Sequence, residues 1–418
     1  MSIQRIKGFA DLFPPASSAF TRMENCARAV FDRYGFVELR TPLLEYTELF
    51  QRSLGEETDV VSKEMFTFAD RKGRSLTLRP EATAGVVRAF IEDGRANRET
   101  VSRLFTIGPM FRYERPQMGR MRQFHQINCE CLGPDSPVAD AELISMLMRF
   151  LSDIGVRDLS LKLNSLGCAE CRPRYREILA GYLRAVNTDA LCDDCARRVE
   201  KNPLRVLDCK RDGCRELTRN APKISDSLCA ECAEHFAAVR ALLGADSISF
   251  DLDHRLVRGL DYYCRTTFEA VSGAIGAQSA VAGGGRYDGL VRDLGGADVP
   301  GVGFACGMER LALLLSESGT RRPDFYLLAM NDDFLEMAFL FAHALRDSGL
   351  SGLLDSGVGG FKSRMRRAGK SGARYCLIIG ADEAAKGTVS IKTMDSGEQV
   401  VIPRSQVVRY LQPGDRHE

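Results

Sequence analysis

The chain has 418 residues, of which 44% are hydrophobic and 27% charged, with a formal net charge of +1. This is the composition of an ordinary soluble globular protein, and the length suggests two or three domains. So small a net charge excludes a global basic field, so any nucleic-acid binding must use local patches. The sequence has neither the apolar core of a signal peptide nor a long apolar run. We therefore expect a cytoplasmic protein without membrane contacts, whose 14 cysteines are reduced.

The first half of the chain, together with residues 268–315, alternates helices with short strands and hairpins. Apolar residues at helical spacing and runs with period two distinguish the two kinds of element. Antiparallel strands with interspersed helices predict an α+β domain. The predicted elements are helix 16–34, strand 36–40, strands 64–68 and 75–78, helix 82–93, strands 104–113 and 122–132, helix 140–154, strands 268–270, 280–283 and 303–306, and helix 308–315.

Two segments differ from this body. Residues 166–240 contain eight of the 14 cysteines and are predicted to be a helical insertion. From Asp324 onward strands and helices alternate, which is typical of a separate small α/β domain. Residues 321–323 form the expected linker. The elements expected in the last domain are strands 325–329, 352–355 and 375–379, helices 334–346 and 361–369, a hairpin turn at 395–397 and a closing helix at 406–411.

The hairpin at 111–130 is the most informative segment of the chain. Strand residues alternate between two faces, so Ile127, Cys129 and Cys131 can enter a core. The other parity then presents Phe124, Gln126, Asn128 and Glu130 to a cavity, since a carboxylate is not buried without a partner. The planar guanidinium of an arginine such as Arg112 can bind two phosphate oxygens at once. The loop adds Arg115, Arg120 and Arg122. A solvated basic loop is the alternative, but the polar parity favours a site for an amine-bearing ligand beside a phosphate.

Four other segments carry weaker signals. Glu81 either stabilises a helix start or, with Thr83, holds an ammonium group. In residues 258–263 the adjacent tyrosines would face opposite ways in an extended chain, so only one need reach a cavity. The glycine-dense run 283–288 lacks the Lys-Ser/Thr of a Walker loop, and is either a turn or a backbone approached by substrate. Arg310 lies in the first turn of a helix, where anions are favoured, although it could be a surface arginine.

Together these segments resemble the class II aminoacyl-tRNA synthetases, and among them the histidyl-tRNA synthetases. Residues 20–42, 111–130 and 303–310 match the three class motifs, and residues 258–263 and 283–288 match the histidine-specific signatures. The resemblance covers almost the whole chain. It implies a catalytic domain (1–165 and 241–320) with an antiparallel sheet and flanking helices, a Cys-rich helical insertion (166–240) and a C-terminal α/β anticodon-binding domain (324–418).

The same resemblance implies ATP-dependent ligation of L-histidine to tRNA(His) through histidyl-adenylate, releasing AMP and diphosphate, with Mg2+ and as a homodimer. Arg258 and Arg112 would stabilise the negative charge on the α-phosphate of ATP during adenylate formation. Arg112 would also bind the histidine carboxylate. On the ATP side, Phe124 would stack on adenine, Glu114 would contact its amino group and Arg310 would hold the γ-phosphate. On the histidine side, Glu81, Thr83 and Gln126 would hold the ammonium group, and Glu130 and Tyr263 would bind the imidazole beside Tyr262. The chain departs from the family pattern at Ala82 and Asn128, where glycine is frequent, and at Met118 and Met121 in the hairpin loop.

The eight cysteines of the insertion form four pairs. The first two pairs give C-x2-C, twenty residues, C-x2-C, which is close to a zinc-ribbon spacing. We expect structural Zn2+, with free core thiols or a redox role as alternatives, and the spacing leaves open which pairs combine. The resemblance implies that the insertion clamps the tRNA acceptor stem, with Lys201, Arg205, Lys210, Arg211 and Arg215 as candidate phosphate contacts. The cysteine pairs are Cys168 and Cys171, Cys192 and Cys195, Cys209 and Cys214, and Cys229 and Cys232.

A basic run without acidic residues spans 361–374 and is a candidate RNA-binding patch, or else a solvated helix. A different class of function is a non-catalytic, histidine-binding regulatory subunit of ATP phosphoribosyltransferase. Such relatives lack the anticodon-binding domain and tend to lose motif residues, whereas this chain has both. The basic residues of the run are Lys362, Arg364, Arg366, Arg367, Lys370 and Arg374.

Overall fold

The computed structural model describes residues 3–55, 58, 60–186, 190–278, 280–315 and 322–412. The chain divides into two compact units, residues 1–318 and 319–418, which are described separately. Of the predicted linker 321–323, Arg321 lies outside the described residues. Within the described part of the chain, each helix is too short or too polar to cross a membrane.

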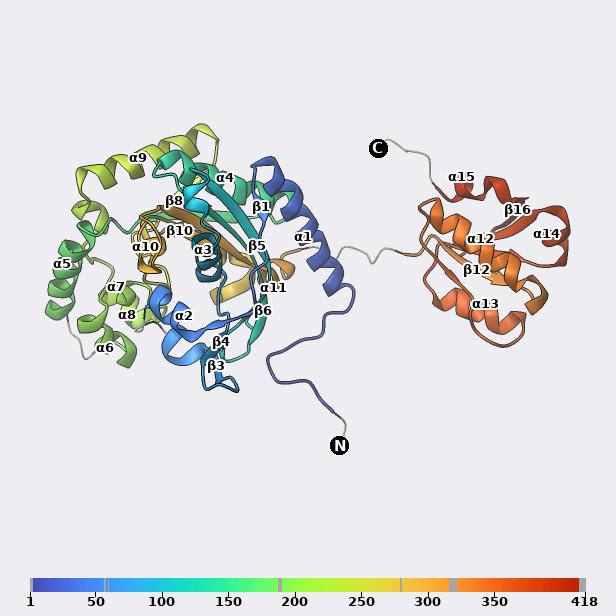
Figure 1. Ribbon diagram of the computed structural model, residues 1–418, viewed down its shortest axis with the longest axis horizontal. Helices are drawn as coiled ribbons and strands as arrows, with labels where there is room; N and C mark the ends of the chain where they lie inside the picture. The colour runs from blue at the N-terminus through green and yellow to red at the C-terminus, as the bar shows by residue number, and fades with distance from the viewer. Residues whose placement is uncertain are drawn as a thin grey trace. The chain divides into compact units, whose positions relative to one another are not determined.

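The first unit is built on an eight-stranded sheet (Figure 1). Its central strands pair antiparallel, and only the short edge strands β1 and β8 run parallel to their neighbours. The predicted α+β class and antiparallel sheet are therefore confirmed. In spatial order the strands are β1 (Val37–Glu38), β5 (Ser102–Phe111), β6 (Gln123–Leu132), β11 (Gly301–Gly307), β10 (Ala280–Arg286), β9 (Cys264–Ser272), β7 (Leu159–Ser165) and β8 (Phe250–Leu252).

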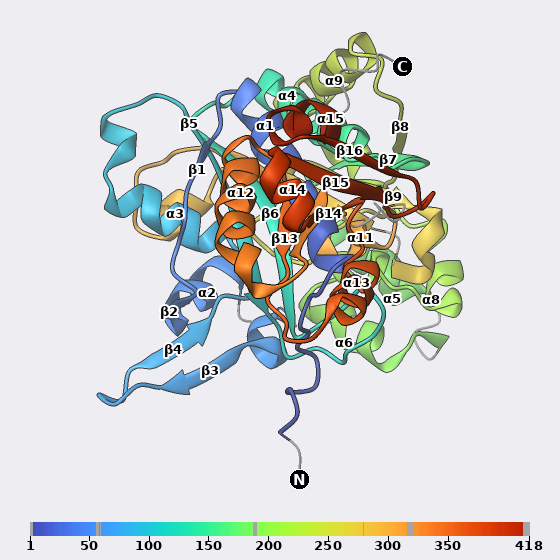
Figure 2. The same cartoon turned by 90° about the vertical axis from the view of Figure 1, so that its right-hand side faces the viewer.

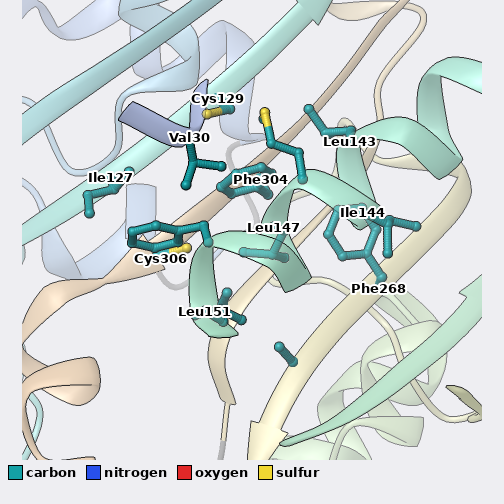
Figure 3. Close-up of a cluster of buried hydrophobic side chains, with 14 of the residues drawn as sticks. Val30, Ile127, Cys129, Leu143, Ile144, Leu147, Leu151, Phe268, Phe304 and Cys306 are labelled. Carbon is teal, nitrogen blue, oxygen red and sulfur yellow. The ribbon is translucent and has the colours of Figure 1, made fainter. Parts of the chain in front are cut away.

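One face of this sheet packs on helices α1 (Ala16–Arg33) and α4 (Pro137–Asp153). The helical spacing of α1 places Phe20, Met23, Ala27, Val30 and Phe31 in the core, as predicted. Each of these side chains except that of Ala27 contributes about 1.5–3 kcal/mol on full burial. Figure 3 shows the core between sheet and helices, where β6 supplies Ile127 and Cys129, β11 supplies Phe304 and Cys306, and α4 supplies Leu143, Ile144, Leu147 and Leu151.

Smaller elements surround the other face. A three-stranded ribbon in the order β2 (Leu44–Tyr46), β4 (Ser75–Leu78) and β3 (Phe66–Ala69) extends from the unit (Figure 2). Helix α2 (Thr47–Leu54) packs against α3 (Thr83–Glu92), which also packs against α10 (Leu290–Asp293). Helix α11 (Met308–Ala312) follows β11 directly, and because β11 is antiparallel to β6, the first turn of α11 lies beside the start of β6.

The cysteine-rich insertion is helical, as predicted, and has its own small core of Tyr175, Leu179, Leu183, Val199 and Val206 among other residues. Its first four helices gather at one side of the unit, and the fifth packs on α4 (Figure 1). The helices are α5 (Cys171–Ala185), α6 (Asp193–Lys201), α7 (Leu204–Leu207), α8 (Asp212–Leu217) and α9 (Ala230–Ala245).

The second unit is a five-stranded mixed sheet with apolar clusters on both faces. The predicted strand and helix alternation forms the parallel part, and the predicted turn at 395–397 joins two further antiparallel strands. In spatial order the strands are β13 (Gly352–Leu354), β12 (Phe325–Ala329), β14 (Tyr375–Ile379), β15 (Thr388–Thr393) and β16 (Gln399–Pro403), with helices α12 (Leu335–Asp347), α13 (Phe361–Lys370), α14 (Ala381–Lys386) and α15 (Val407–Leu411).

Candidate active site

A cavity of about 220 Å³ opens over β6, β10 and β11, on the side of the sheet opposite the core. Phe124 and Gln126 of β6 line it together with four arginines and three glutamates. This arrangement places both signs of charge in one cavity, which suits a zwitterion and a polyphosphate. The charged lining residues are Arg112, Arg120, Arg258, Arg310, Glu114, Glu269 and Glu309.

Four residues predicted to bind ATP lie together in this cavity. Arg112 follows β5, and its Nε donates to the carbonyl of Pro80 at 2.9 Å, which fixes the guanidinium at 5.3 Å above the ring of Phe124. Glu114 pairs with Arg120 of the hairpin loop at 3.1 Å. Arg310 donates to the carbonyls of Ala280 at 2.7 Å and Gly119 at 3.3 Å, so it connects the loop to β10. Burial and the nearby Arg120 lower the pKa of Arg310.

A second, deeper group of polar side chains centres on Glu130, which is only 1% exposed. Its carboxyl accepts hydrogen bonds from Thr83 Oγ1 at 2.7 Å and from the hydroxyl of Tyr287. Gly303 lies opposite Glu130 on β11, and a Cβ there would come within 2.8 Å of the carboxyl carbon. Burial raises the pKa of Glu130 to about 8. The glycine therefore makes room for an acid that a protein interior normally excludes.

Glu81 lies at the start of α3 and fills the structural role that the sequence left open. Its two carboxylate oxygens accept from the backbone N–H groups of Thr83 at 2.7 Å and Ala84 at 2.8 Å. Burial raises the pKa of Glu81, and these two N–H groups oppose the shift. Each oxygen retains a second lone pair, so this contact does not prevent it from accepting from a ligand.

Tyr262 and Tyr263 do not lie in an extended chain, so the condition under which they would face opposite ways is not met. Residues 253–263 form turns and bends rather than a strand, so side chains do not alternate between two faces. The two rings lie 4.5 Å apart, and Tyr262 also packs edge-on against Tyr287 at 5.7 Å. Three tyrosines therefore gather beside Glu130, and burial, together with an ionised Glu130, raises the pKa of each of their hydroxyls.

Arg258 projects from the same segment into the cavity. Its guanidinium pairs with Glu269 of β9 and lies 5.5 Å from the ring of Tyr263. A Cβ at Gly283 would come within 2.8 Å of its Cζ. The glycine run thus admits Arg258, and Gly284 and Gly285 allow close approach of β11 and β9. At Gly284 and Gly285 the atoms that come close to the backbone belong to the neighbouring strands β11 and β9, and not to a space for substrate.

Five polar atoms at this site are buried without a hydrogen-bond partner among the described residues. They are Gln126 Oε1, Asn128 Nδ2, Arg258 Nε, Glu114 Oε2 and Arg120 Nε. An unsatisfied buried polar atom costs about 1–3 kcal/mol. On β6, Gln126 Oε1 is an acceptor and Asn128 Nδ2 a donor, and Arg258 Nε is a further donor; these atoms are available to a polar ligand. Asn128 occupies a position where the family pattern frequently has glycine.

Sequence reasoning missed three residues of the site. Tyr287 stood in the glycine-run signature but was given no role, and it is the group that donates to Glu130. Glu309 accepts from the backbone N–H of His125 at 2.9 Å and so ties α11 to β6. Glu269, the partner of Arg258, lies outside every motif. The one signal for Glu269 is the alternation of β9, which places this charged residue between two buried residues of the strand.

The eight insertion cysteines form two compact groups in which all the sulfur atoms lie within 4.8 Å of one another. The sequence left open which pairs combine; the first two pairs, whose spacing is close to that of a zinc ribbon, lie in different clusters, because the first pair joins the fourth and the second joins the third. Sulfur separations of 3.6 and 3.9 Å occur in the first cluster and 4.0 Å in the second. The first cluster is Cys168, Cys171, Cys229 and Cys232, and the second cluster is Cys192, Cys195, Cys209 and Cys214.

Several arginines expected to contact RNA have partners within the protein. Arg205 donates to the carbonyl of Arg258 at 2.9 Å. In the second unit, Arg364 is buried and pairs with Asp332 at 2.7 Å, and Arg367 pairs with Asp355 at 2.7 Å. The run 361–374 lacks acids in sequence, but acids from neighbouring loops meet it in space. Lys362, Arg366 and Lys370 are exposed and remain candidates for RNA contact.

The sheet, its hairpin and the cavity over β6 and β11 define the catalytic domain of a class II aminoacyl-tRNA synthetase, followed by an anticodon-binding domain. A family model of histidyl-tRNA synthetase matches residues 8–311, and a model of the anticodon binding domain matches residues 324–413. The chain belongs to the histidyl-tRNA synthetase family, as its motifs predicted.

Individual relatives agree with this assignment. The chain is 64% identical over 409 residues to the histidine–tRNA ligase of Nitratidesulfovibrio vulgaris, with 98% of each chain covered. It is 60% identical over 404 residues to that of Oleidesulfovibrio alaskensis, with 96% and 97% covered. The crystal structure of apo S. aureus histidyl-tRNA synthetase matches with a TM-score of 0.81 and 33% identity, covering 98% of this chain and 100% of that one.

Proposed function

We propose that the chain ligates L-histidine to tRNA(His) in two steps, through histidyl-adenylate. One observation carries the proposal: a single strand, β6, contributes Phe124 and Gln126 to an arginine-lined cavity and Glu130 to the enclosed polar group behind it. The arginine-lined cavity can receive a nucleotide, and the polar group around Glu130 can receive a small ring with nitrogen atoms. Adjacent sites on one rigid strand would hold both reactants in register.

On the nucleotide side, Phe124 stacks on adenine, Glu114 accepts from its amino group and Arg310 holds the γ-phosphate. The guanidinium of Arg310 is already fixed by two backbone carbonyls, so little side-chain entropy is lost when it binds a phosphate. Arg112 and Arg258 approach the α-phosphate from two elements of the cavity wall. Each presents donors of fixed geometry that match phosphate oxygens.

On the histidine side, Glu130 binds the imidazole, supported by Thr83, Tyr287 and the neighbouring Tyr262 and Tyr263. Glu81, Thr83 and Gln126 hold the ammonium group, and Arg112 the carboxylate. Because the hydroxyl of Thr83 already donates to Glu130, it faces the ammonium group as an acceptor. A site whose buried polar groups are satisfied only by imidazole nitrogens would reject an isostere without them by a large factor.

In the first step, a carboxylate oxygen of histidine bonds to the α-phosphorus of ATP, and the bond from that phosphorus to the bridging oxygen breaks to release diphosphate. The carboxylate is ionised at neutral pH, so no side chain has to remove a proton. Arg112 and Arg258 are the catalytic residues because they meet the charge that develops on the phosphate. In the second step, a ribose hydroxyl of the tRNA attacks the carbonyl carbon of the adenylate, the bond from that carbon to the phosphate oxygen breaks, AMP leaves, and the hydroxyl proton passes to the AMP phosphate or to water.

Histidine-dependent exchange between ATP and diphosphate tests the first step with purified protein. Wild-type protein should catalyse exchange, and Arg258→Ala should lower its rate by about 10²–10³-fold while histidine still binds. If the wild-type protein lacks exchange, the ligase function is wrong. If the variant loses histidine binding equally, Arg258 serves binding rather than the transition state.

We further propose that Mg2+ enters with ATP. The cavity carboxylates Glu114 and Glu269 are each paired with an arginine, so phosphate oxygens and water would supply most metal ligands, as Mg2+ often prefers.

We also propose a homodimer in the cytoplasm. Ile6, Phe13, Val37 and Tyr46 are large apolar side chains that are exposed in the single chain. Sedimentation analysis should give twice the mass of 46.2 kDa, and a monomer would contradict the dimer.

Each cysteine cluster is proposed to bind one structural Zn2+. Four thiolates at a Zn–S distance of about 2.3 Å imply sulfur separations of about 3.8 Å, and the separations of 3.6, 3.9 and 4.0 Å are close to this value. Metal analysis of purified protein should give about two Zn2+ per chain. A content near zero in folded protein would refute zinc binding.

The regulatory-subunit alternative is less well supported. A solved structure named as an ATP phosphoribosyltransferase regulatory subunit/histidyl-tRNA synthetase from Bacillus halodurans shares the fold, with a TM-score of 0.66 at 18% identity. This chain keeps Arg112, Arg258 and Arg310 and has the domain matched over residues 324–413. These features favour an active ligase that also engages the anticodon.

A further inference from the structure

The segment 258–263 carries Arg258, Tyr262 and Tyr263 but belongs to no helix or strand. A catalytic arginine on such a segment needs support from elsewhere, because a side chain is only as well placed as its backbone. The carbonyl groups of the segment accept hydrogen bonds from two arginines of the cysteine-rich insertion, Arg205 and Arg172. Each of these arginines lies next to one of the two cysteine clusters.

We infer that the insertion positions segment 258–263 through Arg205 and Arg172, and that the metal bound by each cysteine cluster holds these arginines in place. The inference rests on the proposed function, since it assigns the metal sites a role in the same reaction. Arg205 and Arg172 are positioning residues that act through Arg258 and Tyr263.

The second cluster supports Arg258. Arg205 lies in α7, four residues before Cys209, and its Nη1 donates to the carbonyl of Arg258 at 2.9 Å. A reciprocal contact runs the other way: Arg255 donates to Thr218 Oγ1 at 2.8 Å, and this hydroxyl donates to the carbonyl of Cys214 at 2.8 Å. The Arg255 side of this contact ends at Cys214 of the second cluster. Arg205 lies four residues before Cys209 of the same cluster, so a metal there would fix α7 and α8 around the segment.

The first cluster supports the tyrosines. Arg172 directly follows Cys171, and its Nη1 donates to the carbonyl of Tyr263 at 3.0 Å and to that of Asp261 at 3.4 Å. The backbone N–H of Arg265 donates to the carbonyl of Gly167 at 2.8 Å, and its side chain pairs with Glu231, between Cys229 and Cys232. The chain on both sides of this cluster thus holds the segment where it enters β9.

The two supports predict different kinetic defects. Loss of the Arg205 contact releases the backbone behind Arg258, so Arg205→Met should lower kcat for ATP–diphosphate exchange about tenfold or more, with KM for histidine nearly unchanged. Loss of the Arg172 contact displaces Tyr263, so Arg172→Met should raise KM for histidine about tenfold. Arg205→Lys, which keeps one donor, should recover part of kcat. Arg219→Met is the matched control, because Arg219 is exposed on the insertion surface and its ion pair among the described residues is with Glu216.

Hydrogen–deuterium exchange of residues 255–263 tests the role of the metal without activity. Full-length protein stripped of metal by a chelator should exchange faster in this segment than the zinc-loaded protein, and readdition of Zn2+ should restore protection. Equal exchange in the two forms would overturn the metal's role, and wild-type kcat and KM in both arginine variants would overturn the positioning role. Lack of activity in the wild-type protein would instead refute the proposed function, which keeps the two failures distinguishable.

Discussion

Gly283→Ala tests whether the glycine run serves catalysis by admitting Arg258. A Cβ at position 283 would lie 2.8 Å from Arg258 Cζ, whereas ordinary contact begins at 3.4 Å. The difference between these two distances is 0.6 Å, and because Nη1 of Arg258 would lie nearer still, the guanidinium must retreat by more than this. It can do so because the obstructing atoms are the far end of a flexible side chain. The fold should survive, and the ion pair with Glu269 should be disturbed.

Misplacement of a catalytic group by about 1 Å costs on the order of 100-fold in rate. For Gly283→Ala we therefore expect exchange kcat to fall roughly 10- to 100-fold, equivalent to about 1.4–2.7 kcal/mol in the transition state. The free energy of unfolding should change by less than about 1 kcal/mol, because alanine in a strand is no worse than glycine where space allows. Exchange kinetics and urea unfolding measure the two quantities.

Gly284→Ala is the matched control, one residue along the same strand. Its Cβ would overlap the backbone carbonyl of Gly303 and lie 2.8 Å from Phe268 Cζ, so the strands themselves must separate. This change should destabilise the protein by about 1–3 kcal/mol or more. Equal losses of stability in the two variants, or a wild-type exchange rate in Gly283→Ala, would refute the assignment of Gly283 to the Arg258 site.

Three further predictions concern other parts of the molecule. Burial raises the pKa of Glu130 from 4.5 to about 8, so the folded state binds its proton more tightly and this group's stabilisation falls as pH rises between those values. From pH 5 to 7 the loss is about 3 kcal/mol, and Glu130→Gln should remove that part of the pH dependence in urea unfolding; an unchanged slope would contradict it. Arg310→Met should raise KM for ATP about tenfold or more in exchange assays while histidine binding, measured by calorimetry, stays constant. Arg364→Met should destabilise the second unit by about 1–3 kcal/mol in thermal unfolding without a specific loss of tRNA binding, whereas Arg366→Met should weaken tRNA binding and leave stability unchanged; the reverse pattern would refute the distinction.

Local periodicity accounts for the parts of the structure that the sequence predicted well. The apolar residues of α1 recur at helical spacing, and all five of those named from the sequence are buried. The alternation of β6 likewise separated Ile127 and Cys129 from Gln126 and Glu130. Such patterns record which face of an element meets the core, and they need no knowledge of distant residues.

Contacts that depend on distant residues could not be predicted in the same way. The spacing of the cysteines is equally compatible with several combinations, and only the return of α9 beside the start of α5 joins Cys229 and Cys232 to Cys168 and Cys171. The partners of Arg364 and Arg367 lie on other segments, so a run without acids still forms ion pairs. Glu269 was missed because its importance comes from Arg258, not from its neighbours in sequence.

The position of the site on β6 makes its geometry inseparable from the stability of the core. Gln126, Asn128 and Glu130 alternate with Ile127, Cys129 and Cys131, and a register shift of one residue would exchange the two faces. Such a shift would bury polar side chains against α1 and α4 and remove Glu130 from Thr83 and Tyr287. The hydrophobic contacts of one face thus fix the register that the other face needs. Segment 258–263 has no such strand register, which is why hydrogen bonds from the insertion must position it.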